Sequence, residues 1–384
     1  MNFNLHHSVI IIGGGPAGSV TANYLARYGF DTCLIEKKKF PREVLCGEFL
    51  SVEISKMLDE LSLTDEFLFL KPVEITKFRF VNEKGTEISS GFNFQAYALK
   101  RSIFDQFLLK SAVESGVQVY QPAEVKFIKR AGDKFIVELT DQDGKEIIIK
   151  TDYVIAAYGK QNVLDKKLGR NFANPDLKFN AIKFHIPNNY LSDFPEDEIS
   201  VYTDEGIYCG LNRVSQQHTT LCLLTNRING EQSPRQSLLT LIANNKKFAK
   251  LFSRDFERLI YELPIYGTGN LFLGRKTLIE NGVFMVGDAA GVIAPFTGDG
   301  IGMAVQSAKL ISSLLAEQKT SGYAREELER KYSLEWDKLF LNRMRVSLLL
   351  QKLIFNGMVN SISFSVVHFF PFVIPKLVRV TRGI

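Results

Sequence analysis

The chain has 384 residues, 45% of them hydrophobic, which is enough for two domains with sizeable cores. Its four cysteines (Cys33, Cys46, Cys209 and Cys222) lie far apart and its five histidines lack metal-ligand spacing, so we expect neither a disulfide framework nor a metal site. The net charge is +5, and the residues after 337 carry seven basic and no acidic side chains; because no basic and aromatic motif accompanies them, nucleic-acid binding is not expected.

A glycine-rich loop follows the first predicted strand. Residues 9–12 are apolar and β-branched, as in a parallel strand buried on both faces, and Gly13-x-Gly15-x-x-Gly18 comes directly after them. Gly13 permits a tight turn, and Gly15 lets the backbone approach a pyrophosphate. Gly18 lets the next helix, residues 17–28, pack close to the strand with its N-terminal N–H groups facing the phosphates.

An acidic residue ends the second predicted strand. Residues 32–35 form this strand, and the carboxylate of Glu36 can accept hydrogen bonds from ribose hydroxyls. An acid at this position disfavours a 2′-phosphate. The pattern therefore predicts a dinucleotide site for FAD or NAD rather than NADP.

The rest of the chain alternates between two patterns. Helices are predicted at 52–61, 102–114 and 234–244, an antiparallel hairpin within 73–100, and a three-stranded meander leading into a buried strand at 153–157. Residues 177–263 are mostly strands. We interpret this as a discontinuous parallel-sheet domain interrupted by a second, antiparallel-sheet domain, with ligands bound between them. The predicted segments are 1–71, 100–176 and 264–335 for the cofactor domain, 72–99 and 177–263 for the substrate domain, and 336–384 for a C-terminal helical segment.

A second glycine-rich region completes the cofactor site. A short strand at 282–286 ends in Gly287 and Asp288, and Asp288 can hold a ribose or ribityl hydroxyl. The Gly298-Asp299-Gly300 turn then opens a helix at 300–315, whose N-terminus would stabilise the anion of a reduced flavin. The alternative is that Asp299 is an ordinary helix N-cap.

These motifs together resemble the FAD-dependent geranylgeranyl reductase and aromatic hydroxylase (p-hydroxybenzoate hydroxylase-like) superfamily. The resemblance rests on three stretches: Gly13 to Gly18 with Glu36, Phe40-Pro41-Arg42 to Cys46-Gly47-Glu48, and Gly287 to Pro295 with Gly298-Asp299-Gly300. It implies an α/β fold with a Rossmann-like FAD-binding domain of the glutathione-reductase type, an inserted antiparallel-sheet substrate domain and a C-terminal helical tail. It also implies that the flavin ring lies at the domain boundary.

The predicted cofactor residues combine the motif analysis with this resemblance. They are Gly13, Gly15, Pro16, Ala17, Gly18, Glu36, Lys37, Arg42, Cys46, Gly47, Arg101, Val125, Gly287, Asp288, Pro295, Gly298, Asp299, Gly300 and Ile301. Two assignments have alternatives: Cys46 either contacts flavin or substrate or is simply packed, and Arg101 is either near the cofactor or a surface residue. No activating base for Cys46 is visible, so no catalytic side chain is assigned.

The chain departs from both branches of the superfamily. Tyr158-Gly159 stands where hydroxylases have Asp-Gly, and residues 208–212 lack the Trp and Pro that prenyl reductases carry in an aromatic strand. Halogenation is not expected, since the only tryptophan, Trp336, is far downstream. We expect an NAD(P)H-driven FAD monooxygenase acting on a lipophilic aromatic or polyketide-like substrate. The alternatives are a geranylgeranyl-reductase-like enzyme that reduces an isoprenoid double bond and a noncatalytic, electron-carrying flavoprotein. NADPH or NADH would dock transiently, because no second glycine-rich motif exists.

The C-terminal segment is apolar, basic and aromatic. Pro371 and Pro375 forbid one continuous helix there, so no membrane-spanning segment is expected. The segment is either a helical lid that packs on both domains or an interfacial patch that contacts anionic lipid. With no charged and apolar leader before the first strand, a cytoplasmic protein, with or without membrane association, is expected. The oligomeric state stays open.

Overall fold

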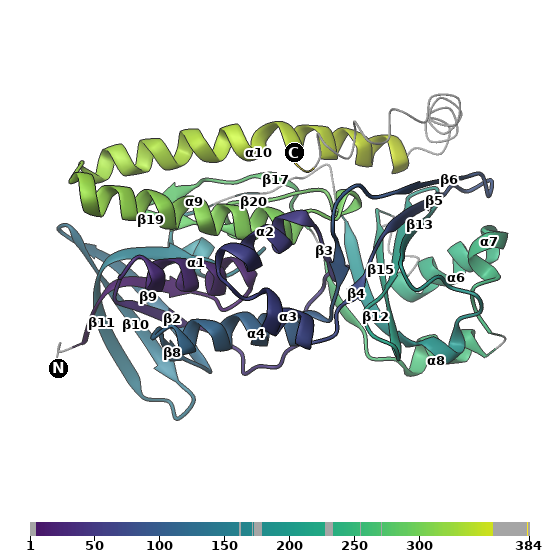
Figure 1. Cartoon of the computed structure of the whole chain (residues 1–384), viewed down its shortest axis with the longest axis horizontal. Coiled ribbons are helices and arrows are strands. Elements are labelled where there is room, and N and C mark those ends of the chain that lie inside the picture. The colour runs from purple at the N-terminus through teal and green to yellow at the C-terminus, as the bar shows by residue number, and fades with distance from the viewer. Residues whose placement is uncertain are drawn as a thin grey trace.

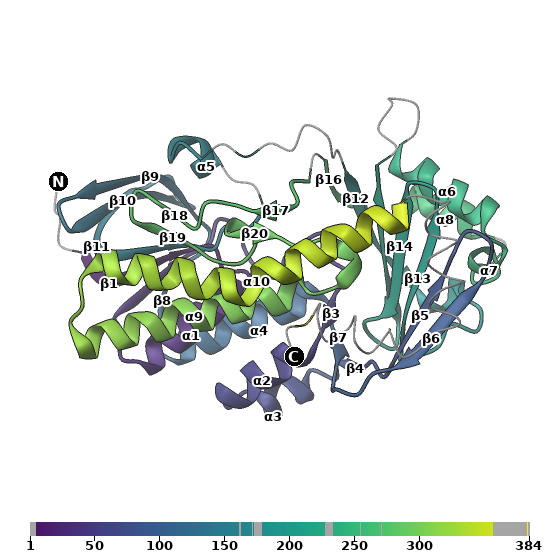
Figure 2. The same ribbon diagram turned by 90° about the horizontal axis from the view of Figure 1, so that it is seen from above.

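The computed structural model describes the chain except for residues 1–4, 161–162, 171, 173–178, 227–232, 254, 270, 356–381 and 383–384. Two domains lie side by side along the long axis of the molecule, and a long C-terminal helix, α10 (Arg325–Phe355), crosses from the first domain to the second (Figures 1 and 2). This is the α/β architecture that the motifs predict.

The cofactor domain is built on an eight-stranded sheet with the order β18-β19-β11-β1-β2-β8, to which β10 and β9 add in antiparallel fashion beside β11. The pairs β1/β11, β1/β2, β2/β8 and β11/β19 are parallel. The central strands consist of consecutive apolar residues, because helices and the meander bury both faces of these strands. The strands are β1 (Leu5–Ile12), β2 (Thr32–Ile35), β8 (Gln118–Tyr120), β9 (Ala123–Ala131), β10 (Lys134–Asp141), β11 (Glu146–Ala156), β18 (Ile279–Glu280) and β19 (Val283–Met285).

Helices α1 and α9 pack against each other beside this sheet, and α4 also packs on α1. Gly287 lies between the two helices: a Cβ there would lie 2.8 Å from the Cβ of Ala17 in α1 and 3.5 Å from the Cβ of Ala304 in α9. The helices and short 3₁₀ turns of this domain are α1 (Pro16–Arg27), α2 (Val52–Glu60), α3 (Thr64–Phe69), α4 (Arg101–Glu114), α5 (Val163–Lys167), η2 (Gly287–Ala289), η3 (Pro295–Thr297) and α9 (Gly300–Ser321).

The substrate domain is a seven-stranded sheet with the order β16-β12-β15-β14-β13-β5-β6. It is antiparallel except for the β13/β5 pair, which is parallel. Its outer face carries three helices, and its inner face is turned toward the cofactor domain (Figure 1). The elements are β5 (Lys77–Val81), β6 (Glu87–Gly91), β12 (Asn180–Pro187), η1 (Asn188–Tyr190), β13 (Glu198–Asp204), β14 (Ile207–Arg213), β15 (His218–Thr225), α6 (Pro234–Asn244), α7 (Lys246–Ala249), α8 (Phe256–Glu262) and β16 (Tyr266–Thr268).

Two elements do not match the domain boundaries predicted from the sequence. Strand β16 lies within the segment from 264 onward that was assigned to the cofactor domain, yet it pairs with β12 in the substrate sheet. Helix α10 begins at Arg325, before the expected start of the C-terminal segment at 336. In both cases the boundary depends on pairing or packing with an element far away in the sequence, and local sequence patterns do not indicate such contacts.

The chain crosses between the domains at a small three-stranded sheet. Strand β7 (Tyr97–Ala98) pairs with both β3 (Phe49–Leu50) and β4 (Val73–Glu74). Farther along the chain, β17 (Gly274–Arg275) pairs with β20 (Gly291–Val292). These short pairs fix how the two large sheets are connected.

Helix α10 is anchored to the central sheet. The hydroxyl of Tyr332 donates a hydrogen bond to the carbonyl of Met285 at 2.5 Å, and Trp336 and Phe340 on the same helix are buried. Most of the apolar C-terminal segment, including Pro371 and Pro375, lies outside the described residues, so the lid and the lipid patch stay predictions. Within the described residues, none of the helices has the length and apolarity needed to cross a bilayer.

Tyr332→Phe is expected to lower the free energy of unfolding by about 1–2 kcal/mol, because it leaves the buried Met285 carbonyl without its donor. Urea unfolding of the purified protein measures this. The matched control is Tyr28→Phe at an exposed tyrosine, where a change within about 0.5 kcal/mol is expected. Equal stability of the two variants would contradict the anchoring role of Tyr332.

Candidate active site

The glycine-rich loop joins β1 to α1 by very close backbone contacts. Gly13 has φ +108°, and a Cβ there would lie 2.5 Å from the carbonyl oxygen of Ala157. A Cβ at Gly18 would lie 1.8 Å from the carbonyl oxygen of Gly13. Both positions therefore require glycine so that the first turn of α1 can reach the end of the strand. Pro16 begins α1, where its missing N–H costs nothing, and Ala17 is buried beside it.

Glu36 fastens this loop to the end of β2. It is buried, and its two carboxylate oxygens accept backbone N–H bonds from Gly14 and Lys38, both at 2.7 Å. A carboxylate offers about four acceptor positions, so these bonds leave capacity for ribose hydroxyls. Glu36 therefore lies beside the loop, and the ribose role predicted for it stays a prediction.

Two guanidinium groups converge on Gly15. Their Nη2 atoms lie 3.7 Å (Arg42) and 3.9 Å (Arg101) from the position a Gly15 Cβ would take. Burial alone would lower the pKa of Arg101, but the charge of Asp105, hydrogen-bonded at 2.6 and 2.8 Å, outweighs this and raises it, so Arg101 is a fixed cation. The Nε of Arg42 is buried and makes no hydrogen bond to the described residues, although it lies 3.7 Å from the Glu36 carboxylate. Two guanidinium groups beside a helix N-terminus suit a pyrophosphate, so these residues fit FAD.

Other predicted cofactor residues lie around this cradle. Val125 is buried in β9, whereas the Lys37 ammonium is exposed and paired with Glu124 at 2.6 Å. Asp288 lies in the η2 turn after β19, and its charge acts on the nearby Lys276 ammonium. Its role toward a ribityl or ribose hydroxyl stays a prediction.

The loop before α9 is a tight turn that ends at the helix N-terminus predicted to face the flavin. Pro295 begins η3, Gly298 has φ +62°, and α9 begins at Gly300 followed by the buried Ile301. Asp299 occupies the N-cap position, but its side chain makes no capping hydrogen bond. The ordinary N-cap alternative is therefore wrong for this side chain, although its carboxylate and that of Glu53 lie beside Gly302 in the first turn of α9.

The Asp299 carboxylate instead pairs with two arginines from the C-terminal part of the chain. Arg343 on α10 donates to Asp299 and to Glu53, and Arg382 lies 3.5 Å from Asp299 and donates to the carbonyl of Thr297 at 2.7 Å. Burial raises the pKa of Asp299 to about 7, against the opposing charge of Arg343. The C-terminal region is thereby tied directly to the loop before α9.

The Cys46-Gly47-Glu48 stretch runs between the two domains. Glu48 has a left-handed backbone with φ +61°, which is uncommon for a residue with a side chain, and its N–H donates to the Sγ of Cys46 at 3.3 Å. Cys46 is half-buried, packs beside the cluster of α2 and α4 residues, and interacts with Arg101. The thiol therefore borders the pyrophosphate cradle and is also packed.

Glu48 is a buried carboxylate with four hydrogen bonds. One oxygen accepts from the backbone N–H of Arg101 and from the Nζ of Lys183, both at 2.9 Å. The other oxygen lies 2.6 Å from the Nε2 of His185 and accepts from the hydroxyl of Thr220. Burial would raise the pKa of Glu48, but the His185 hydrogen bond and the Lys183 charge outweigh it and lower the pKa to about 2. Glu48 is a permanent anion that joins α4 to β12 and β15.

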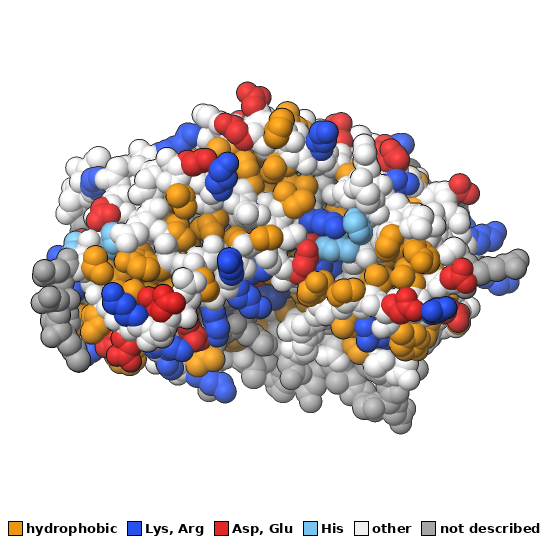
Figure 3. Space-filling model, turned by 90° about the horizontal axis from the view of Figure 1, so that it is seen from below, with side chains coloured by type: hydrophobic (Ala, Val, Ile, Leu, Met, Phe, Trp, Pro, Cys, Tyr) orange, Lys and Arg blue, Asp and Glu red, His pale blue; other side chains and the backbone are white. Residues whose placement is uncertain are grey.

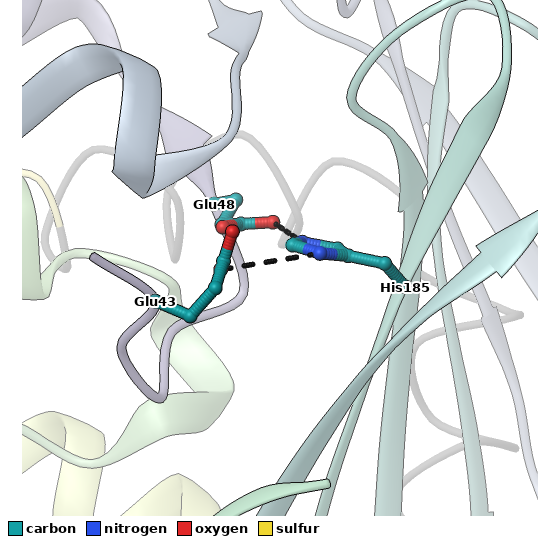
Figure 4. Close-up of side chains that lie close together, drawn as sticks. All are labelled: Glu43, Glu48 and His185. Atoms are coloured by element: carbon teal, nitrogen blue, oxygen red, sulfur yellow. Dashed lines mark hydrogen bonds and ion pairs between the residues drawn. The ribbon is translucent and has the colours of Figure 1, made fainter. Parts of the chain in front are cut away.

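Sequence reasoning missed Lys183, His185 and Thr220. Figure 4 shows Glu43 and Glu48 from the loop converging with His185 from β12. The signal lay in β12, where Lys183 and His185 alternate with apolar residues and so share one face of a strand. Basic, acidic and histidine side chains also lie close together near the domain junction on the underside of the molecule (Figure 3).

Glu43, Glu48 and His185 have ligand atoms within 4.8 Å of one another, a spacing compatible with a metal ion. The Lys183 ammonium, however, lies 2.7 Å from Glu43 and 2.9 Å from Glu48. A fixed positive charge therefore already lies between the two carboxylates, where a metal ion would have to bind. We therefore describe this group as an ion-pair network, named here the Glu48 network: Glu43, Glu48, Lys183, His185 and Thr220.

Part of the inner face of the substrate sheet is apolar. We name Phe78, Phe80, Val201, Tyr208 and Leu224 the apolar floor; they lie on the face that also carries Lys183 and His185. Phe296, in η3 beside the predicted flavin position, meets this floor, with ring centroids 5.6 Å from Phe80 and 5.9 Å from Tyr208.

A glycine-rich strand-to-helix turn, an arginine cradle and a second glycine loop at the domain junction define a dinucleotide-binding flavoprotein. The chain matches the family described as FAD binding domain over residues 6–339, and it belongs to that family. It is an FAD-dependent oxidoreductase, as its motifs predict.

Known relatives agree with this class. The digeranylgeranylglycerophospholipid reductase of Methanococcus vannielii is 24% identical over 354 residues, which is 90% of this chain and 87% of that protein. The enzyme of the same name from Methanosarcina acetivorans is 28% identical over 368 residues, 91% of this chain and 85% of that protein.

Solved structures share the fold. A flavoprotein/dehydrogenase from Cytophaga hutchinsonii has a TM-score of 0.79 at 20% identity, covering 94% of this chain and 88% of that chain. A geranylgeranyl bacteriochlorophyll reductase-like protein from Thermoplasma acidophilum has a TM-score of 0.76 at 21% identity, covering 91% and 88%. At these identities the likeness concerns the fold alone.

Gly15→Ala is expected to leave the apoprotein stable, because the backbone at Gly15 (φ −72°) accepts alanine. It is expected to weaken FAD binding by roughly tenfold or more, because the new Cβ enters the space between the two arginines. Fluorescence titration with FAD measures the affinity. Gly91→Ala in β6 is the control, with no expected change in FAD affinity. Unaltered binding by Gly15→Ala would contradict the pyrophosphate cradle.

Glu48→Gln tests the permanent anion. Because the folded-state pKa of Glu48 is lowered from 4.5 to about 2, its contribution to stability is present above the unfolded pKa and is lost as the pH falls. The stability advantage of the wild type over Glu48→Gln is expected to shrink by about 2 kcal/mol between roughly pH 6 and pH 3. Urea unfolding across this range measures it, with the exposed Glu114→Gln as control. A pH-independent difference would show that Glu48 is not held as an anion.

Proposed function

We propose that the protein uses FAD to reduce a carbon–carbon double bond in a lipophilic, isoprenoid-like substrate. The observation that carries this proposal is the contact between Phe296 and the apolar floor. It brings the aromatic face of the substrate sheet directly to the loop beside the predicted flavin position, where a hydrocarbon chain would find apolar contacts.

The relatives support reduction over hydroxylation. The proteins at 24% and 28% identity are both named as reductases of a digeranylgeranyl lipid, and each aligns over about nine-tenths of this chain. Hydroxylation of an aromatic or polyketide-like substrate, which the sequence favours, needs the same cofactor site and is kept as an outcome of the test.

The chain's own residues would hold FAD in the cradle and exclude water from the ring. Arg42, Arg101 and the N-terminus of α1 would bind the pyrophosphate, Glu36 the ribose, and the N-terminus of α9 would stabilise negative charge on the reduced ring. Reduced FAD supplies a hydride equivalent when bound. NADPH or NADH, docking transiently, is our proposed reductant.

The proposal predicts that FAD-reconstituted protein, reduced without oxygen by NADPH or NADH, is reoxidised by geranylgeraniol in detergent micelles. The product should gain two hydrogens per reduced double bond by mass spectrometry. Phytanol, which has no double bond, is the control and should leave the flavin reduced.

Two results would contradict double-bond reduction. The first is a reduced flavin that geranylgeraniol leaves unchanged. The second is oxygen consumption that rises on adding an aromatic lipid, with hydroxylated product, which would establish the monooxygenase alternative. Reduction by dithionite but by neither nicotinamide would replace NAD(P)H with a separate electron donor.

A further inference from the structure

We propose that His185 is the proton donor of this reduction, held in place by the Glu48 network. This inference rests on the proposed function. Adding hydrogen to a double bond requires a hydride at one carbon and a proton at the other, and a buried apolar site needs a dedicated acid to provide the proton.

His185 lies on the correct face of the substrate sheet. In the pairing of β12 with β15, His185 lies opposite Thr220, and Lys183, one row away on the same face, lies opposite Cys222. On the next strand, β14, Gly210 lies opposite Cys222. Leu224 and Tyr208 occupy the next row and belong to the apolar floor. Since side chains on one face recur about every 7 Å along a strand, His185 is within two rows of the floor.

The imidazole is oriented by the network, and one of its nitrogens makes no hydrogen bond. Its Nε2 is bonded to Glu48 at 2.6 Å, whereas its Nδ1 is 3.9 Å from Glu43, too far for a hydrogen bond. The side chain of His185 is 12% exposed, so water can return a proton to it. The carboxylate fixes the ring orientation, and Nδ1 is the position from which a proton can be transferred.

Two of the neighbouring ionisable groups, Glu48 and Lys183, are poorer donors. Glu48 has a pKa lowered to about 2 and carries no proton near neutrality. Lys183 is fully buried between two carboxylates that raise its pKa against the opposing effect of burial, so it keeps its proton. Histidine is the side chain that most readily gives and regains a proton near neutral pH.

The step balances as follows. The π electron pair of the double bond takes the Nδ1 proton of the His185 imidazolium and forms one new C–H bond. The hydride equivalent brings two electrons for the other C–H bond, so the alkene is reduced and the cofactor oxidised. Neutral His185 then regains a proton from water.

Three forms of the FAD-bound protein test this proposal: wild type, His185→Gln and the control His218→Gln. His218 is a neighbouring histidine, with its ring centroid 6.4 Å from that of His185, and it is not one of the residues of the Glu48 network. We expect His185→Gln to lower kcat by about 100-fold or more, with KM and FAD affinity within about threefold of wild type. His218→Gln should keep kcat within about threefold.

A second measurement does not depend on turnover. ¹⁵N NMR of histidine-labelled protein identifies the His185 ring by its loss in His185→Gln, and both ring nitrogens should carry protons at the assay pH. If the wild type reduces geranylgeraniol and His185→Gln keeps kcat within about threefold, the role of His185 is overturned but the proposed function is not. An unprotonated Nδ1 in the wild type has the same meaning. A wild type that fails to reduce geranylgeraniol overturns the proposed function, and with it the role of His185.

Discussion

The buried carboxylate of Glu48 is the interaction on which the domain arrangement depends. Its four partners come from the N-terminus of α4 and from two strands of the substrate sheet, so one side chain connects both domains. A buried anion is tolerated only when its hydrogen bonds and opposite charges replace the water it has lost. The left-handed backbone at Glu48, costing on the order of 1–2 kcal/mol, is maintained by the same contacts.

This constraint also determines what the junction can do chemically. The loop held by Glu48 includes Cys46, which borders the arginine cradle, and the strand that Glu48 contacts carries His185. Charged groups therefore line one end of the inner face, and aromatic groups line the other, where Phe296 approaches from the cofactor domain. A lipophilic substrate would lie on the aromatic end with its reacting carbons toward the charged end.

A second buried charge cluster connects the C-terminal region to the cofactor site. Asp299, at the start of α9, is shared by Arg343 of α10 and by Arg382. Helix α10 therefore does more than cover the sheet, because its arginine neutralises a carboxylate next to the predicted flavin position. Glu53 on α2 joins the same cluster, so three separate elements meet there.

The sequence alone determined the strand, glycine loop, helix and acid of the FAD site, the two-domain α/β class and most helix positions. Each of these depends on residues close together in the chain, such as Gly13, Gly18 and Glu36. Only the tertiary structure decided the Glu48 network, the pairing of Asp299 with Arg343 and the membership of β16 in the substrate sheet. The physical reason is distance along the chain: Lys183 follows Glu48 by 135 residues, and such contacts leave no periodic pattern in either segment.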